Sequence, residues 1–343
     1  MAKVLILGGG GFIGINIARR LMDDGGYIIT LADKTYRGRL EEYFPDPAER
    51  EQLTVIEDDF SQPAAYERLD DAYDHVYMMA AIVGVNRTLE HPEEVIRVNT
   101  ALTLYTLEWL QRARVGRVVF ASSSENYAAT TDLFDYPIPT PETVPLCVSD
   151  VQHPRWTYAL TKMHGEAAFL HTGPTAGFEA TVVRYQNAFG PAMGFRHVIP
   201  HLVQRFWEGE DPFPIYGADQ TRAFCFITDS VDGTVRAMET PRAAGGIYHI
   251  GASEEITLET LSKTVGELMG FRGTYDRGPT YPGSVQRRCP DISKAREALG
   301  YEPQVHWREG LERTVRWYRD FFASGRRPDD VGFEPPQKFA TKG

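Results

Sequence analysis

The sequence predicts an α/β protein in which helices cover both faces of a doubly wound parallel sheet. Two observations carry this prediction. Short apolar runs alternate with stretches of helical periodicity through the first half of the chain. Such alternation is typical of parallel strands joined by right-handed crossover helices. The first apolar run also ends in a glycine turn that opens a helix, the arrangement of a Rossmann sheet that binds a nucleotide.

The elements follow in order along the chain. We expect strands at 4–7, 27–32, 53–56, 75–79, 117–121 and 180–184, with helices at 13–22, 93–114 and 157–171. Beyond residue 185 the pattern loosens, with helices expected at 198–208, 230–239, 258–269 and 307–322 and strands at 224–227 and 246–250. We therefore predict a nucleotide-binding domain over 1–185, a smaller C-terminal substrate lobe over 186–325 that interleaves with the last strands, and a surface tail over 326–343.

Composition narrows the class of protein. The 343 residues are 42% hydrophobic and carry a net charge of −11, which argues against nucleic acid as a partner. No apolar run approaches the ~20 residues of a membrane span, so we expect no membrane association. The three cysteines are odd in number and widely spaced, which indicates reduced thiols and a cytoplasmic protein. The histidines lack ligand spacing, and no metal site is predicted.

The glycine turn has the form of a dinucleotide cradle. Gly8 permits a tight turn off the strand, Gly11 allows close approach of a pyrophosphate, and Gly14 lets the helix lie close to the sheet. The pyrophosphate would rest on the helix N-terminus. Asp33 ends the next apolar run, where a carboxylate can accept hydrogen bonds from ribose hydroxyls and repel a 2′-phosphate. The expected cofactor is therefore NAD, not NADP.

Four polar residues form a candidate catalytic set. Tyr158 and Lys162 share one helix face, and an ammonium there favours the phenolate form of the tyrosine. Ser123 and Glu125 follow the strand at 117–121, at the sheet edge where substrates bind. Each feature has a plainer interpretation: Tyr-x-x-x-Lys is common on solvated helices, serines cap helices, and an exposed glutamate is ordinary. Their conjunction with the cradle favours catalysis.

At this point the chain resembles a known family, the extended short-chain dehydrogenases/reductases that modify nucleotide sugars. The resemblance covers most of the chain. It rests on Gly-Gly-Gly-Gly-Phe-Ile-Gly at 8–14, Asp-Asp-Phe at 58–60, Met-Ala-Ala at 79–81, Asn-Thr at 99–100, the Ser/Tyr/Lys set, Arg-Tyr-Gln-Asn at 184–187 with Gly-Pro at 190–191, and Gln-Thr-Arg-Ala-Phe at 220–224. Three positions depart from the family pattern: Met78-Met79 replaces His-Leu, Ala128 replaces Gly, and Ala192 stands where many members have Arg.

The resemblance implies roles for individual residues. Cofactor contacts would come from the glycine turn, Asp33, Tyr158 and Lys162, and also from Phe12, Ile13, Asp59, Phe60, Ala80, Ala81 and Asn99. Substrate contacts would come from Ser124, Arg155, Asn187, Arg222 and Arg288. The substrate would be a nucleoside-diphosphate sugar. Relatives pair the helices at 93–114 and 157–171 between two subunits, which implies a homodimer.

The family chemistry implies an epimerase or dehydratase with no net redox change. NAD takes a hydride from the sugar and later returns it, and the transient ketone activates the neighbouring carbon. Tyr158 would be the base for oxidation, and Glu125 the acid/base of the second step. The Pro-Arg-Trp-x-Tyr segment before Tyr158 also resembles one group of bacterial decarboxylases, so decarboxylation of a nucleotide-linked uronate is an alternative. A non-catalytic NAD-binding scaffold and a plain NAD(P)H reductase are further alternatives.

Overall fold

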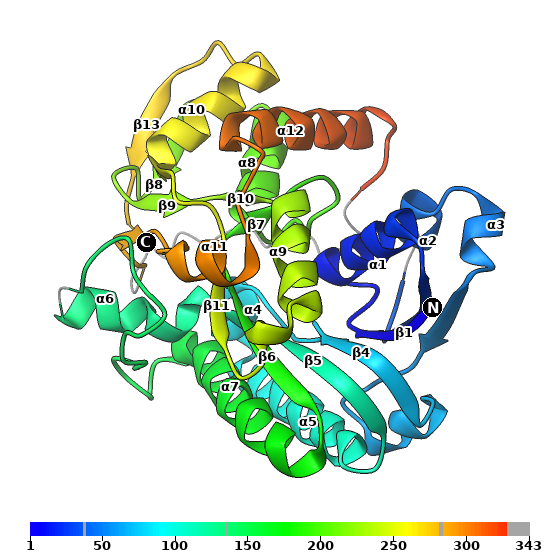
Figure 1. Cartoon of the computed structure of the whole chain (residues 1–343). Helices are drawn as coiled ribbons and strands as arrows, with labels where there is room; N and C mark the ends of the chain where they lie inside the picture. The colour runs from blue at the N-terminus through cyan, green and yellow to red at the C-terminus, as the bar shows by residue number, and fades with distance from the viewer. Residues whose placement is uncertain (37–38, 135, 281–283, 328–343) are drawn as a thin grey trace.

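The centre of the protein is a seven-stranded parallel sheet, in a computed structural model that describes residues 1–36, 39–134, 136–280 and 284–327 (Figure 1). The strand order is β11-β6-β5-β4-β1-β2-β3. These strands are β1 (Ala2–Leu7), β2 (Tyr27–Asp33), β3 (Leu53–Glu57), β4 (Ala72–Met78), β5 (Arg114–Ser123), β6 (Glu179–Tyr185) and β11 (Ile247–Ile250). All six pairings are parallel. The predicted doubly wound α/β fold is confirmed.

The central strands are buried on both faces because successive side chains alternate between two cores. In β1, Val4 and Ile6 belong to one apolar cluster, and Leu5 and Leu7 belong to the other. All four are fully buried. A continuous apolar run of this kind is what a parallel strand covered by helices requires.

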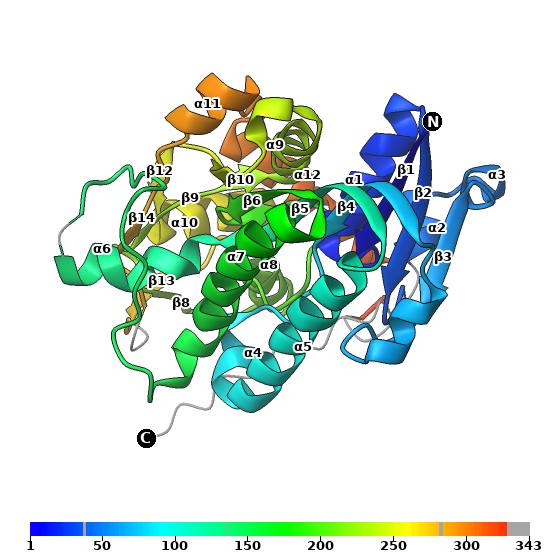
Figure 2. The same ribbon diagram turned by 60° about the horizontal axis from the view of Figure 1, so that its bottom comes forward.

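Two helix layers supply the two cores. On one face α1 (Phe12–Asp24) packs beside α9 (Ile227–Glu239). On the other face α5 (Pro92–Leu110) packs along α7 (Thr157–Ala176), as Figures 1 and 2 show from two directions. The order of the sheet reverses between β1 and β4, and in sheets of this type the ligand binds at that switch point, outside the carboxyl ends of the strands.

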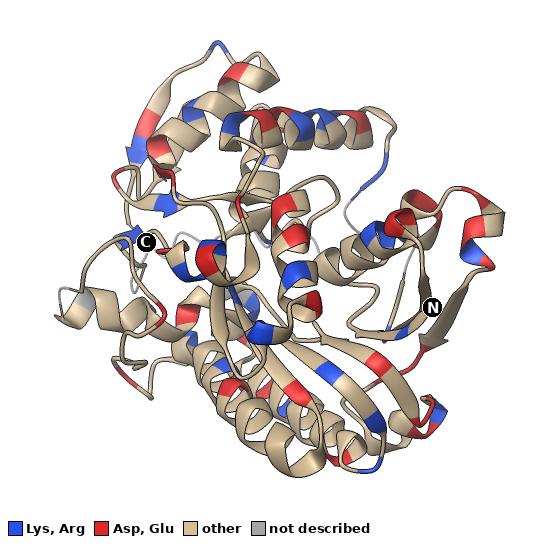
Figure 3. Ribbon diagram, in the orientation of Figure 1, with Lys and Arg blue, Asp and Glu red and all other residues tan. Residues whose placement is uncertain are grey.

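The chain after residue 185 builds a second group of elements. Its short strands pair as β7 (Ala188–Phe189) with β10 (Cys225–Phe226) and β8 (Phe213–Tyr216) with β13 (Tyr275–Gly278). The strand β9 (Thr221–Ala223) lies between β12 (Glu255–Thr257) and β14 (Arg287–Arg288) and pairs with both. Its helices are α8 (Val198–Trp207), α10 (Leu258–Met269), α11 (Ser293–Leu299) and α12 (Trp307–Ala323). Acidic and basic residues both lie along α12 (Figure 3). The same part of the chain also supplies β11 and α9 to the large sheet and its helix layer.

The expected elements differ from the structure in a few places. The helix expected over 93–114 ends at Leu110, because Arg114 already begins β5 with its N–H donated to the Asp71 carbonyl. The strand expected over 224–227 is limited to β10, because Ile227 begins α9. Five short helices were not predicted: α2 (Arg39–Tyr43), α3 (Pro47–Arg50), α4 (Val85–Glu90), α6 (Ala128–Phe134) and α11. Residues 328–343 of the expected tail lie outside the described part.

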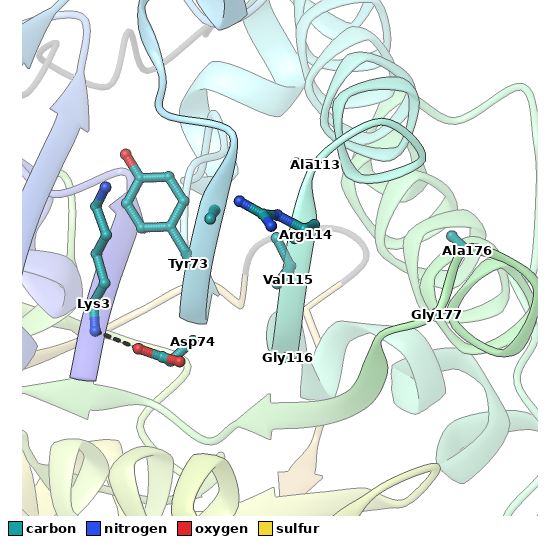
Figure 4. A pocket seen from close by; sticks show the side chains of 10 residues that line it. Lys3, Tyr73, Asp74, Ala113, Arg114, Val115, Gly116, Ala176 and Gly177 are labelled. Carbon is teal, nitrogen blue, oxygen red and sulfur yellow. Dashed lines mark hydrogen bonds between the residues drawn. The ribbon is translucent and has the colours of Figure 1, made fainter.

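A hollow of about 580 Å³ opens at the amino ends of the strands, between the starts of β1, β4 and β5 (Figure 4). Lys3, Asp74 and Arg114 line it together with the end of α7. It lies at the opposite edge of the sheet from the predicted catalytic residues. Within the described ranges, no helix has both the length and the apolar character needed to cross a membrane. The same ranges hold no group of three or more metal-ligating side chains.

Candidate active site

The glycine turn between β1 and α1 forms a close-packed cradle. Gly8 has φ +87°, and a Cβ there would lie 2.5 Å from the Ala80 nitrogen. A Cβ on Gly14 would lie 2.1 Å from the Gly8 carbonyl oxygen, so only glycine lets α1 start this close to the turn. A Cβ on Gly11 would lie 3.1 Å from the Gly8 carbonyl oxygen, and no side chain caps the helix there. The N–H groups at the start of α1 are thus left for an anion, and the residues fit a dinucleotide pyrophosphate.

Asp33 closes the cradle from the end of β2. Its Oδ2 accepts a hydrogen bond from the Gly10 N–H at 2.9 Å, and its Oδ1 accepts one from the Lys34 N–H at 2.6 Å. Burial raises the pKa of this carboxyl, and the N–H groups of Lys34 and Gly10 oppose that rise. The side chain is therefore tied to the turn that would hold the pyrophosphate.

Four further predicted cofactor residues lie at the start of α1 or just after β3. Phe12 and Ile13 begin α1, and Phe60 is buried after β3. Asp59 accepts hydrogen bonds from Ser61 and from the Lys34 ammonium, the latter at 2.8 Å.

Asn99 lies on α5 and is buried. Its side-chain oxygen accepts the Ile82 N–H at 2.7 Å, and its amide donates to the Ile82 carbonyl at 3.1 Å and to the Thr161 hydroxyl at 3.3 Å. This amide fixes the segment that begins with Ala80 and Ala81, which passes over the glycine turn.

Ser123, Tyr158 and Lys162 come together at the carboxyl end of β5. Tyr158 hydrogen-bonds with the Ser123 side chain. The Lys162 ammonium lies 5.8 Å from the centre of the Tyr158 ring and donates to the Ala121 carbonyl at 2.8 Å. Gly165 makes this approach possible, because a Cβ there would lie 2.2 Å from the Phe120 ring. The glycine brings α7 down onto β5, and Lys162 then reaches the strand.

The two titrating groups of this set are both shifted by burial. Burial raises the pKa of Tyr158 well above its ordinary value, the charge of Glu125 raises it further, and the hydrogen bond with Ser123 lowers it. Burial lowers the pKa of Lys162 from 10.5 to about 8, while the Glu166 carboxylate opposes that change. Lys162 is thus the group of the pair that loses a proton first as the pH rises.

Glu125 is held between two arginines. Its Oε1 accepts from Arg288 at 2.7 Å and its Oε2 from Arg155 at 3.2 Å. Burial alone would raise the pKa of Glu125, but Arg288 and then Arg155 outweigh it and bring the pKa to about 2. Glu125 is therefore an ionised carboxylate near neutral pH, and Arg222 adds to the positive field around it.

The other predicted substrate residues lie on the second group of elements or beside Glu125. Ser124 is buried. Asn187 adopts a positive φ of 39° and donates to the Ala223 carbonyl at 2.8 Å. Arg222 lies on β9 and donates to its neighbouring Thr221 carbonyl at 2.7 Å. In β14, Arg288 pairs in register with Arg222, so these two cations approach Glu125 from adjacent strands.

Sequence reasoning missed Glu166, which the structure places beneath the same site. Its carboxylate accepts from Ser122, Asn126 and Arg184, all of them buried. A signal was present, because Tyr158, Lys162 and Glu166 follow at intervals of four and so share one face of α7.

Comparison with known proteins agrees with this geometry. The model of the NAD dependent epimerase/dehydratase family matches residues 4–251. The chain is 29% identical over 331 residues to a UDP-N-acetyl-alpha-D-glucosaminuronate decarboxylase of Bacillus cytotoxicus, covering 93% of this chain and 98% of that protein. It is 30% identical over 314 residues to UDP-glucuronic acid decarboxylase 3 of Arabidopsis thaliana, covering 90% and 86%.

Among solved structures, a dTDP-glucose 4,6-dehydratase from Streptomyces venezuelae with NAD bound superposes with a TM-score of 0.82 at 26% identity, covering 94% of this chain and 98% of that one. The predicted family, enzyme class and cofactor are confirmed by these comparisons. The chain belongs to the NAD-dependent epimerase/dehydratase family and is an NAD-dependent enzyme.

Proposed function

We propose that this enzyme removes carbon dioxide from a nucleoside-diphosphate-linked uronic acid, after transient oxidation of a sugar hydroxyl to a ketone. The observation that carries the proposal is the ionised Glu125 between Arg155 and Arg288, beside Tyr158. When bound, NAD takes a hydride from the sugar and later returns it, so the reaction has no net redox change. The glycine turn, Asp33 and the helix N-terminus of α1 are the residues that would hold it.

In the oxidation step, Tyr158 accepts the proton of the sugar hydroxyl and Ser123 aligns that hydroxyl. The Tyr158–Lys162 pair must first release one proton, and the pKa of about 8 at Lys162 allows this near neutral pH. The proton that stays on the pair can then reside on Lys162, and the ammonium so formed stabilises the phenolate form of Tyr158.

In the second step, a carboxylate β to the new ketone leaves as carbon dioxide. The electron pair of the broken C–C bond moves toward the ketone oxygen, so no base has to remove a C–H proton, and the enolate so formed takes a proton from water at that carbon, which restores the ketone. Guanidinium groups are the usual partners of carboxylates and phosphates, and Arg155, Arg288 and Arg222 lie around Glu125 at this end of β5. We propose that Asn187, Arg222 and Arg288 also contact the diphosphate.

Glu125 does not fit the acid role in loss of water. A leaving hydroxyl needs a proton donor, whereas the salt bridges to Arg288 and Arg155 hold Glu125 as a carboxylate. In a dehydratase it would be the base that removes the proton beside the ketone, and the product test below separates that function from decarboxylation. We propose instead that Glu125 holds the two arginines in place and offsets part of their charge.

The test is the mass of the product. The purified enzyme is incubated separately with UDP-glucuronic acid, UDP-N-acetylglucosaminuronic acid, UDP-glucose and dTDP-glucose, with Tyr158→Phe as the inactive control. Loss of carbon dioxide from either uronate is the expected result. An unchanged mass with an altered sugar configuration would indicate epimerisation, and loss of water would indicate dehydration. Either of those results would replace the decarboxylase proposal.

We also propose that the enzyme is a cytoplasmic homodimer. Apolar side chains on α5 and α7 remain exposed, with Ile96 at 44%, Leu104 at 47% and Leu160 at 37%. A second copy of the chain that packs against α5 and α7 would bury these side chains in a two-fold symmetric dimer interface. Light scattering of the wild type and of Leu104→Glu tests the assembly, with the dimer expected to weaken in the variant. A wild-type monomer at micromolar concentration would contradict it.

A further inference from the structure

Glu166 is a buried carboxylate one helical turn beyond Lys162. It accepts four hydrogen bonds: from the Ser122 hydroxyl at 2.5 Å, from the Asn126 amide at 2.8 Å, and from Arg184 at 2.8 Å and 2.7 Å. The side chains of Arg184 and Glu166 are only 2% and 5% exposed. An ion pair buried this deeply pays a large desolvation cost, so stability alone does not account for it.

The partners of Glu166 lie on both sides of the catalytic turn. Ser122 immediately precedes Ser123, and Asn126 immediately follows Glu125. Asn126 also donates to the Ser122 hydroxyl at 3.1 Å, so the two flanks of the turn are joined to each other as well as to Glu166. Arg184 enters from the neighbouring strand β6 and donates to the Glu142 carbonyl at 3.1 Å.

We propose that Glu166 is a positioning residue, which holds the turn bearing Ser123 and Glu125 at a fixed place relative to Tyr158 and Lys162. The inference rests on the proposed function of Ser123 and Tyr158. Its geometric basis is that one face of α7 carries the tyrosine, the lysine and the glutamate. Movement of the turn against the helix would break the bonds of Glu166 and separate the serine from the tyrosine.

The charge of Glu166 also acts on Lys162. Among the described residues, the charge that acts on that ammonium is Glu166, and its contacts are the Tyr158 ring on α7 and the Ala121 carbonyl and Phe120 ring on β5. Glu125 acts on Tyr158, and Arg184 pairs with Glu166. Because Glu166 opposes the effect of burial on Lys162, a variant without its charge lowers the pKa of Lys162 further.

Two variants separate positioning from simple structural support. Ser122→Ala removes two hydrogen bonds, one to Glu166 and one from Asn126, and strands no charge. Glu166→Gln keeps the shape and removes the charge. The measured quantities are kcat, KM, bound NAD and the rate of nicotinamide reduction by UDP-glucuronic acid in a single turnover. If the product test identifies another substrate, that substrate replaces UDP-glucuronic acid.

We expect kcat to fall about 10-fold in Ser122→Ala and about 100-fold in Glu166→Gln, since misplacement by about 1 Å costs that much. KM and NAD content should stay within about twofold. In Glu166→Gln alone, the rising limb of the plot of kcat against pH should move to lower pH, because the pKa of Lys162 falls. A wild-type kcat in both variants would overturn the proposal. A rise in KM together with a loss of bound NAD would also overturn it, because that result indicates that the whole site is destabilised.

A half-buried ion pair away from the site provides the control. Arg205 and Glu210 pair at 2.6 Å, and their side chains are 10% and 38% exposed. Glu210→Gln should lower the melting temperature and leave kcat unchanged. If Glu166→Gln does not fold, Glu166→Leu/Arg184→Met removes the pair without a stranded charge, and wild-type kcat in that variant overturns the proposal. Full activity of Tyr158→Phe would instead overturn the proposed function, so the two failures are distinguishable.

Discussion

Replacement of Lys162 by methionine should make the protein more stable while it abolishes activity. The ammonium is 4% exposed, and its pKa is lowered from 10.5 to about 8 mainly by burial. At about 1.4 kcal/mol per pKa unit, holding this charge in the folded state costs about 3 kcal/mol at neutral pH. Loss of the hydrogen bond to the Ala121 carbonyl destabilises the variant by about 1 kcal/mol. The net gain for Lys162→Met is about 2 kcal/mol.

The gain should depend on pH in a defined window. Because the folded pKa lies below the unfolded one, the unfolded chain binds the extra proton between about 8 and 10.5, and wild-type stability rises with pH there. The advantage of the variant is therefore full below pH 8 and disappears as the pH rises toward 10.5. With an unfolding entropy of about 2.1 cal/mol/K per residue over 343 residues, 2 kcal/mol corresponds to about 3 °C.

The assay is thermal unfolding of the NAD-free protein at neutral pH and again near pH 10. Lys263→Met is the control, because Lys263 is half-exposed and pairs with Glu259 on the surface of α10, so its effect should stay within about 0.5 kcal/mol at either pH. A Lys162→Met protein that is less stable than wild type at neutral pH, or whose advantage persists unchanged near pH 10, would refute the reasoning from burial.

Three further predictions concern the other site residues. Tyr158→Phe should fold and retain NAD but lose at least about 1,000-fold in turnover, and a near wild-type rate by product assay would exclude Tyr158 from the mechanism. Glu125→Gln should still reduce bound NAD when substrate is added, with product formation slowed about 100-fold because Arg155 and Arg288 lose their anchor; normal product formation would show that the anchor is dispensable. Asp33→Ala should weaken the preference for NAD over NADP by about 10-fold in a binding titration, and an unchanged preference would place the discrimination elsewhere.

The fold could be predicted because its strands are continuous apolar runs and its first turn needs glycine. The positions of Gly8 and Gly14 leave no room for a Cβ, so the glycines in the sequence directly indicate the tight turn. Tyr158 and Lys162 were found for a similar reason, since helical spacing alone places them together.

The arrangement around Glu125 could not be predicted in the same way. Its partners Arg155 and Arg288 lie 30 and 163 residues away, and only the packing of the second group of elements onto the sheet brings Arg288 to it. The ionisation of the Glu125 carboxyl follows from those contacts. The hydrogen bonds of Glu166 to Ser122 and Arg184 also join three separate elements, and no periodic pattern along the chain specifies them.

The interleaving of the two halves has a consequence for synthesis on the ribosome. Arg20 on α1 pairs with Asp232 on α9 at 3.2 Å, and β6 receives its outer neighbour β11 only from residues 247–250. A nascent chain that has emerged through residue 185 thus has an open sheet edge at β6 and an uncovered apolar side on α1. Unpaired edges and exposed apolar faces are what promote association between chains. The first 185 residues must therefore wait for about 65 more before β6 is paired on its outer side, and chaperone protection is most needed during that interval.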